Sequence, residues 1–96
     1  MLSEGEVRFA FGQLVATPGA LEALRRNPSV GVWTYLSRHL TGDWGDLEAA
    51  DKAENELSLR EGFRLLSAYV LPDGTRIWII TEADRSVTTV LLPGEY

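Results

Sequence analysis

The residues from Glu82 to Ser86 are the best equipped for chemistry in this 96-residue chain, because five positions hold two carboxylates, a guanidinium and a hydroxyl. Arg85 could clamp a phosphate, Glu82 could act as a base, and the hydroxyl of Thr88 or Thr89 could bind an oxyanion. The single histidine, His39, would supply an imidazole. If the protein is an enzyme, we expect Glu82, Arg85, His39 and Thr88 to carry the reaction.

The same stretch also has the composition of a plain turn between two strands. Polar residues suit a solvated hairpin loop, and Asp84 and Arg85 would form a surface pair there. Small microbial ribonucleases, and the toxins that resemble them, place Arg, Glu, His and hydroxyl groups on a sheet that follows helices. Since a shared fold does not fix a reaction, we favour a turn or a binding rim over a ribonuclease-like site.

A metal or cofactor site is not indicated by the residue spacing. Asp43 follows His39 by four residues, but no third or fourth ligand stands at a matching spacing, and the chain has no Cys. A histidine near a helix end more often caps or hydrogen-bonds, because a cation is favoured there. We therefore expect no metal and no cofactor.

Negative charge is concentrated in the middle of the chain. Residues 43 to 61 hold seven acids and two bases, and this balance of −5 equals the net charge of the whole protein. Nucleic-acid binders need a basic face, so direct binding to a duplex is disfavoured. An acidic helix can instead imitate a nucleic-acid backbone and occupy the basic channel of a protein that binds nucleic acid. The ordinary alternative is a solvated helix face with internal ion pairs.

Trp44 is the aromatic residue of this acidic segment. It would either anchor a partner within a ring of carboxylates or fold back over the core between two helices, and we favour the second role. The residues expected to contact a partner protein are Asp43, Trp44, Asp46, Glu48, Asp51, Glu56, Asp84 and Arg85.

Three helices are predicted before residue 62. Thr17-Pro18 starts the first, since Thr caps and Pro is tolerated at the first helical position, and Asn27-Pro28 ends it. Ser29 would cap a second helix over Val30–Leu40, and Asp46 would cap a third that runs to about Arg60. Apolar spacing places two buried stripes on the second and third helices. Their members are Val30, Trp33, Leu36 and Leu40, and Leu47, Ala50, Ala53 and Leu57.

Strand patterns follow from residue 63 onward. Phe63–Leu71 and Thr75–Glu82 flank the hairpin signal Pro72-Asp73-Gly74, and Val87–Leu92 completes a three-stranded meander. The middle strand is apolar on both sides, so we expect it to be central. The alternation of Val7–Phe11 predicts a short further strand within Glu6–Val15. The predicted class is α+β, with N-terminal helices packed on a three- or four-stranded antiparallel sheet.

Length and composition predict one domain over residues 1–96. No apolar run approaches the roughly 20 residues that span a bilayer, so no membrane association is expected. The acidic start, Met1–Glu6, lacks the basic and apolar regions of a secretory signal. A cytoplasmic location is the expectation.

Four segments together resemble a family of short, uncharacterised bacterial proteins found on plasmids and other mobile elements. They are Gln13–Leu21, Arg38–Leu47, Arg64–Tyr69 and Trp78–Tyr96. The resemblance covers roughly residues 13–96 and implies a genomic setting, with no activity and no catalytic residue. The family's motif positions include Asp43, Trp44, Asp46, Asp51, Asn55, Glu82, Asp84 and Arg85.

Three functional hypotheses follow from these observations. The first is a small acidic, non-enzymatic interaction protein that binds or inhibits a nucleic-acid-handling protein, such as a defence or restriction system. The second is a ribonuclease-like toxin, although the chain lacks the basic surface that such toxins usually carry. The third is a homodimeric scaffold in which an exposed sheet edge pairs with another copy. We favour the first, since both the acidic segment and the mobile-element resemblance point to it.

Overall fold

The computed structural model describes residues 6–96, which form three α-helices, four strands and a short 3-10 helix. In chain order the elements are β1 (Gln13–Ala16), α1 (Pro18–Arg25), α2 (Val32–Leu40), α3 (Ala49–Glu61), β2 (Leu65–Val70), β3 (Arg76–Thr81), β4 (Val87–Leu91) and η1 (Pro93–Glu95). The predicted α+β class is confirmed. No helix within the described residues is both long enough and apolar enough to cross a membrane.

The four strands form one sheet in the order β1-β4-β3-β2. The antiparallel meander of β2, β3 and β4 occurs as predicted, with Ser67 opposite Ile79 and Ile79 opposite Val90. β3 is central, as its apolar residues on both faces predict. β1 is shorter than the predicted segment 6–15 and pairs in parallel with β4, so the sheet is mixed.

Gly12 marks the point where the chain joins the sheet. Its φ is +64°, and a Cβ added to it would lie 2.2 Å from the carbonyl oxygen of Ser86. The next residue, Gln13, donates its N–H to that same oxygen at 2.9 Å. Only glycine tolerates both the backbone angle and the close approach. The alternating residues Val7–Phe11 therefore precede the strand instead of forming it.

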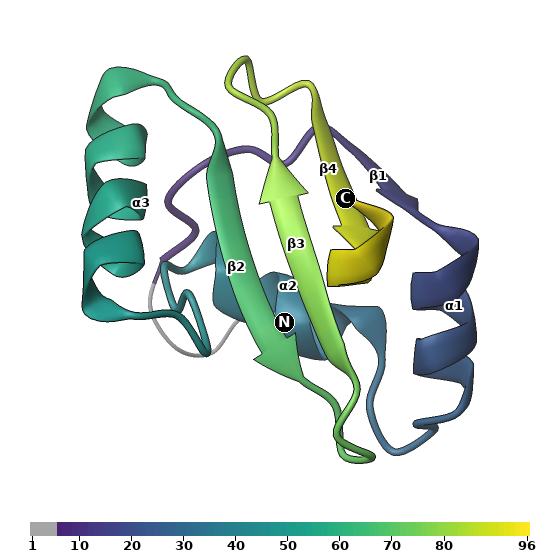
Figure 1. Cartoon of the computed structure of the whole chain (residues 1–96). Helices are drawn as coiled ribbons and strands as arrows, with labels where there is room; N and C mark the ends of the chain where they lie inside the picture. The colour runs from purple at the N-terminus through teal and green to yellow at the C-terminus, as the bar shows by residue number, and fades with distance from the viewer. Residues whose placement is uncertain (1–5) are drawn as a thin grey trace.

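Helices cover one face of the sheet more completely than the other (Figure 1). α2 crosses the face that we call the inner face, where Ile77 and Ile79 share a core cluster with Leu36 and Leu40. Trp78 therefore points to the opposite, outer face, because side chains alternate along a strand. α3 lies beside the edge strand β2, and η1 lies over the outer face near β4.

The sequence places the start of α1 correctly and the start of α2 two residues early. The Thr17 hydroxyl caps α1 by accepting the Ala20 N–H at 3.2 Å, with Pro at the first position as predicted. α2 begins at Val32, and its N-cap is Gly31 instead of Ser29. This difference of two residues is within the range by which helix ends commonly vary.

The predicted buried stripe of α2 is correct at Leu36 and Leu40 and wrong at Trp33. Trp33 is 56% exposed, and its ring packs edge-on against Phe11 at a centroid distance of 5.9 Å. His39, which was not assigned to the stripe, is fully buried. Helical spacing gives the direction of a side chain around the axis but not whether another element covers that turn.

α3 begins later than predicted because Asp46 has a different role. The helix starts at Ala49, with Glu48 as its N-cap. Asp46 donates its backbone N–H to the Ala68 carbonyl at 2.7 Å, and its carboxylate pairs with Arg76 at 2.6 Å. Asp46 thus holds the loop before α3 against β2 instead of capping the helix.

The predicted apolar side of α3 is also wrong. Ala50 and Ala53 are exposed, whereas Asn55 and Ser58 are the buried residues of this helix. The reason is that α3 lies along the edge of the sheet, where β2 presents backbone groups that need polar partners. A stripe of alanines would leave those groups unsatisfied.

Candidate functional site

Arg85 is held by backbone carbonyls within the protein. Its Nη1 donates to Phe63 at 2.7 Å and to Glu82 and Ala83 at 3.2 Å each, and its Nη2 donates to Ser58 at 3.2 Å. The Ser58 carbonyl belongs to the last turn of α3, where a cation is favoured by the helix dipole. The guanidinium therefore joins α3 to the β3–β4 loop, and its terminal nitrogens are occupied.

The loop around Arg85 is a closed turn. Arg85 has φ +61°, and its N–H donates to the Glu82 carbonyl at 2.9 Å. The Asp84 carboxylate accepts from the Ser86 hydroxyl at 2.6 Å and from the Ser86 N–H at 3.0 Å. These bonds hold the pKa of Asp84 below its usual value. Asp84 thus bonds to Ser86, and the predicted Asp84–Arg85 pair is not among the ion pairs of the described residues.

His39 and Thr88 belong to a buried chain of hydrogen bonds on the inner face of the sheet. The Thr88 hydroxyl donates to the Phe11 carbonyl at 2.8 Å, so it accepts from the Thr81 hydroxyl at 2.7 Å. Thr81 in turn accepts from His39 Nε2 at 2.9 Å. His39 Nδ1 then accepts from the Ser67 hydroxyl at 2.5 Å. This order assigns a neutral imidazole with its proton on Nε2.

The surroundings of His39 keep it neutral. Burial, and secondarily the positive charge of Arg85, lowers its pKa from 6.5 to about 3. Phe9 and Trp44 pack against the imidazole, with ring centroids 5.1 and 5.8 Å away, and none of the side chain reaches solvent. His39 is therefore a core residue and not the cationic helix cap that its position suggests. The C-cap of α2 is Thr41.

The four residues nominated for catalysis thus fall into two groups. His39 and Thr88 meet through Thr81 inside the core, where both are 0% exposed. Glu82 and Arg85 lie in the turn at the end of the hairpin, where Arg85 is engaged with carbonyls. A site that uses the imidazole together with Glu82 would need the core to open.

Trp44, nominated as a partner anchor, is 3% exposed. Its indole N–H donates to Glu56 at 3.0 Å, and its ring stacks on Phe9 at 6.3 Å. Arg8 donates two hydrogen bonds, of 2.9 and 3.0 Å, to the same Glu56 carboxylate. The bonds from Arg8, and secondarily that from Trp44, lower the pKa of Glu56. Trp44 and Glu56 therefore close the structure between the N-terminal segment and α3.

The acidic segment splits into paired and unpaired carboxylates. Asp43 pairs with Arg38 at 2.7 Å, Asp46 with Arg76 and Glu56 with Arg8, and all three arginines come from outside the segment. The four-residue spacings in and before α3 predict the pairs Glu48–Lys52 and Glu56–Arg60, and neither occurs among the ion pairs of residues 6–96. The acids of the segment without an ion pair in this range are Glu48, Asp51, Glu54 and Glu61, which lie along α3 and its N-cap.

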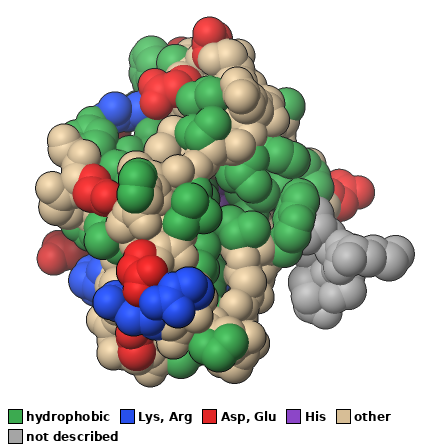
Figure 2. Space-filling model, turned by 90° about the vertical axis from the view of Figure 1, so that its right-hand side faces the viewer, with side chains coloured by type: hydrophobic (Ala, Val, Ile, Leu, Met, Phe, Trp, Pro, Cys, Tyr) green, Lys and Arg blue, Asp and Glu red, His purple; other side chains and the backbone are tan. Residues whose placement is uncertain are grey.

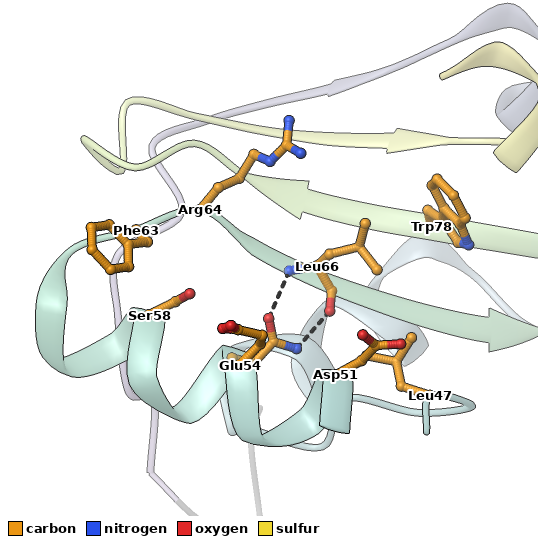
Figure 3. A pocket seen from close by; sticks show the side chains of 9 residues that line it. Leu47, Asp51, Glu54, Ser58, Phe63, Arg64, Leu66 and Trp78 are labelled. Carbon is orange, nitrogen blue, oxygen red and sulfur yellow. Dashed lines mark hydrogen bonds between the residues drawn. The ribbon is translucent and has the colours of Figure 1, made fainter. Parts of the chain in front are cut away.

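A groove of about 520 Å³ lies between α3 and the outer face of β2 and β3. Figure 3 shows Leu66 and Trp78 on the sheet side, with Asp51 and Glu54 on the helix side. The groove therefore combines an apolar floor with an acidic wall. The complete lining is Leu47, Asp51, Glu54, Asn55, Ser58, Phe63, Arg64, Leu66 and Trp78.

Asn55 fixes the width of this groove. Its amide nitrogen donates to the Leu66 carbonyl at 2.7 Å, and its amide oxygen accepts the Leu66 N–H at 3.1 Å, as the dashed lines in Figure 3 mark. The side chain thus imitates a neighbouring strand at one residue. Asn is a weak helix former, so an Asn in the middle of a predicted helix is the sequence signal for a special contact at that position.

The far lip of the groove is aromatic. Tyr96 is 63% exposed, and its ring meets Trp78 at 5.7 Å in a T-shaped contact. The Arg64 guanidinium lies 5.2 Å from the centre of the Tyr96 ring, so its charge is directed toward this ring. Phe63, at the end of α3, is 54% exposed. Arg64, Leu66 and Trp78 were not identified from the sequence, because only the folded hairpin brings them beside α3.

Comparison with protein-family models, with curated proteins and with solved structures gives no match to this chain. Within residues 6–96, no three His, Cys, Asp or Glu side chains come together in a way that would hold a metal ion. The interpretation of the site therefore depends on the geometry of the groove and on the charges around it.

Proposed function

We propose that the protein is a non-enzymatic interaction protein whose α3 side binds a basic surface of a nucleic-acid-handling protein. The observation that carries this proposal is the row of carboxylates along α3 that form no ion pair within residues 6–96, beside a preformed groove. Opposite charges steer association and set specificity at such surfaces. The partner would be a protein whose own ligand is a polyanion.

The paired acids make this surface more restricted than the composition suggests. Asp43, Asp46 and Glu56 hold the loop before α3 and the N-terminal segment in place through arginines. Of the four acids without an ion pair in residues 6–96, the three at the N-cap and in the first half of α3 form the surface offered to a partner, with the groove beside them: Glu48, Asp51 and Glu54. In this proposal Trp44, which is 3% exposed, and Glu56, which is bonded to Arg8 and Trp44, support the surface and do not contact the partner.

The ribonuclease-like alternative receives less support from the geometry. The only imidazole is enclosed in the core and neutral, and the terminal nitrogens of Arg85 bond to backbone carbonyls. The resemblance to mobile-element proteins agrees with a role against, or alongside, a host defence or restriction system. That setting is part of the proposal.

A capture experiment tests the acidic surface. Immobilised protein is incubated with bacterial extract, and the bound proteins are identified by mass spectrometry. We expect nucleic-acid-binding proteins that elute with salt and that duplex DNA competes away, since both ligands would use one basic site. Neutralising Glu48, Asp51 and Glu54 together should abolish the capture. These side chains make no described hydrogen bond, so the fold should be retained.

A matched control removes three negative charges elsewhere. Glu22→Gln, Asp73→Asn and Glu82→Gln combined give the same net charge as the α3 variant, on α1 and at the two hairpin turns. Equal capture by both variants would show that net charge alone is responsible. Unchanged capture by the α3 variant would refute the proposed surface.

A further inference from the structure

We infer that the groove between α3 and β2–β3 binds an extended basic segment of the partner protein, with a lysine or arginine stem lying along Trp78. The inference rests on the proposed function, because it assigns the chemistry of the segment that the same surface would receive. Its positive charge would lie between Asp51 and Glu54. The inference is carried by the volume of the groove, its floor, its charge and its rigidity.

The volume fits a few side chains and not a folded domain. At about 520 Å³ the groove is within the range of small-ligand and peptide pockets. It runs beside α3, where Figure 3 shows Phe63 near the C-terminal end of the helix and Leu47 before its first turn. An extended chain would follow this direction and place successive side chains into it.

The floor suits the aliphatic part of a long basic side chain. Leu66 and Trp78 are both half-buried and face the groove from neighbouring strands. Lysine and arginine bury their methylene stems on apolar surface while the charge stays at the water boundary, and an indole face attracts a cation. A purely apolar side chain would fill the floor but leave the acidic wall without a counterion.

The charge of the wall is negative, and no cation of the described residues pairs with it. Asp51 and Glu54 are three residues apart, on one side of α3, and neither forms an ion pair within the described residues. The one arginine of the lining, Arg64, lies over the Tyr96 ring. A cationic segment therefore gains attraction at the helix wall, and an acidic one would depend on Arg64 alone.

The groove is preformed, and recognition through it must use side chains. The two Asn55–Leu66 bonds tie its helix wall to its sheet wall. The next outward groups of β2, at Ala68, are occupied by the backbone of Trp44 and Asp46. An incoming segment therefore finds these edge groups already paired and cannot add there as a fifth strand.

The test uses an acetylated and amidated hexapeptide of alternating leucine and arginine, titrated into 15N-labelled protein. The three indole N–H signals serve as built-in reporters, because only Trp78 lines the groove. We expect the Trp78 signal to shift, and those of Trp33 and Trp44 to stay in place. Asp51→Asn combined with Glu54→Gln should weaken binding by about tenfold or more.

The alternatives give distinct results. A leucine–glutamate hexapeptide that binds more tightly, and loses affinity with Arg64→Gln, would overturn the assignment of a basic occupant. A shift confined to Trp33 would place binding on the other side of the molecule and also overturn it. Asp51, Glu54 and Trp33 all lie at the surface, so the Asp51→Asn/Glu54→Gln variant and the Trp33→Ala variant should both stay folded. A loss of peptide binding in the first variant but not in the second is therefore not caused by unfolding.

The same variants separate this inference from the proposed function. If Trp78→Ala, shown to be folded by its NMR spectrum, still captures the partner as the parent does, the groove assignment fails while the acidic surface stands. If the leucine–arginine peptide shifts Trp78 but no partner is captured from the extract, the groove assignment stands and the proposed function fails.

Discussion

The two edges of the sheet are finished in opposite ways. At the β2 edge, Asn55 bonds both outward backbone groups of Leu66, and the loop of Trp44 and Asp46 bonds both groups of Ala68. Within the described residues, this edge is therefore closed along its first four residues. Such covering prevents a strand from recruiting another chain.

Among residues 6–96, nothing covers the β1 edge in this way. Gln13 donates its N–H to Ser86, just before β4, and Thr17 donates its N–H to Val90 in β4, so by alternation the groups of Leu14 and Ala16 point outward. No described residue bonds to them. Figure 2 shows hydrophobic side chains gathered on this side of the molecule, and the exposed apolar residues near β1 and α1 include Val15 and Leu21. Within the described residues, the β2 edge is thus closed by bonds inside the protein, whereas the β1 edge is open to contact with another chain.

The comparison explains why α3 does not look amphipathic. Its inward position 55 carries Asn, because the neighbour there is a strand edge whose backbone groups need a polar partner and not an apolar surface. α2 packs on the middle of the sheet and buries Leu36 and Leu40 in the ordinary way. The type of surface that a helix covers decides which residues it must bury.

Removing Asn55 should have the largest effect on the closed edge. Asn55→Ala leaves both Leu66 groups without a partner, which should lower the free energy of unfolding by about 3 kcal/mol. Urea unfolding followed by circular dichroism measures this change. Glu54→Ala, at the exposed neighbouring position, is the control and should change stability by less than about 0.5 kcal/mol. Equal losses for the two variants would contradict the role assigned to Asn55.

The buried histidine ties the two edges together. Its chain of hydrogen bonds starts at Ser67 on β2, passes through Thr81 and Thr88, and ends at Phe11 just before β1. Because the pKa of His39 is about 3 in the folded protein and 6.5 ordinarily, the unfolded chain binds the proton first as pH falls. This contribution to stability is complete above pH 6.5 and decreases below it.

We expect the free energy of unfolding to fall by about 2 kcal/mol between pH 7.5 and pH 5. Glu56 and Asp43, whose pKa values are lowered by arginines, lose their contributions only at still lower pH, so this window isolates His39. The His39→Gln variant should show a flat profile from pH 7.5 to 5, whatever its absolute stability. A parent profile that is equally flat would show that the His39 imidazole takes up its proton as readily in the folded protein as in the unfolded chain.

Features of the fold that depend on neighbouring residues could be predicted from the sequence, and contacts between distant residues could not. The turn at Pro72-Asp73-Gly74, the cap at Thr17 and the central position of β3 depend on local chemistry or on apolar pattern, and these predictions are confirmed. Asn55 and His39 are buried polar residues whose partners lie 11 to 42 residues away. No local pattern identifies such partners, so the edge cover and the core chain could not be predicted.

The candidate site was predicted only in part for the same reason. Glu48 and Asp51 were named from the acidic pattern, and they remain exposed. The charge of Asp43, Asp46 and Glu56 is paired with arginines distant in sequence, which composition cannot reveal. The sheet side of the groove forms only when the hairpin folds against α3.

Variants of Arg85 test how α3, which covers the closed edge, is attached to the β3–β4 loop. Arg85→Ala and Arg85→Gly both remove the four carbonyl bonds, but Ala must also adopt the left-handed φ of +61°. We therefore expect the Gly variant to be about 1 kcal/mol more stable than the Ala variant, and both to be less stable than the parent. Urea unfolding measures the difference. A Gly variant as stable as the parent would show that the guanidinium contributes nothing to the attachment of α3.

The smallest effect concerns the open edge, where pairing between copies would give a homodimer. A molecule with one open and one closed edge can form a closed two-fold pair but not a growing sheet. We expect weak, concentration-dependent self-association in sedimentation equilibrium, and its loss in Val15→Lys, since an edge lysine opposes pairing. The matched control is Val70→Lys at the end of β2, which is 46% exposed and should leave self-association unchanged. A parent that stays monomeric at high concentration would mean that the apolar surface around β1 does not pair with itself. The two edges would then differ only in whether their outward backbone groups bond to protein or to water.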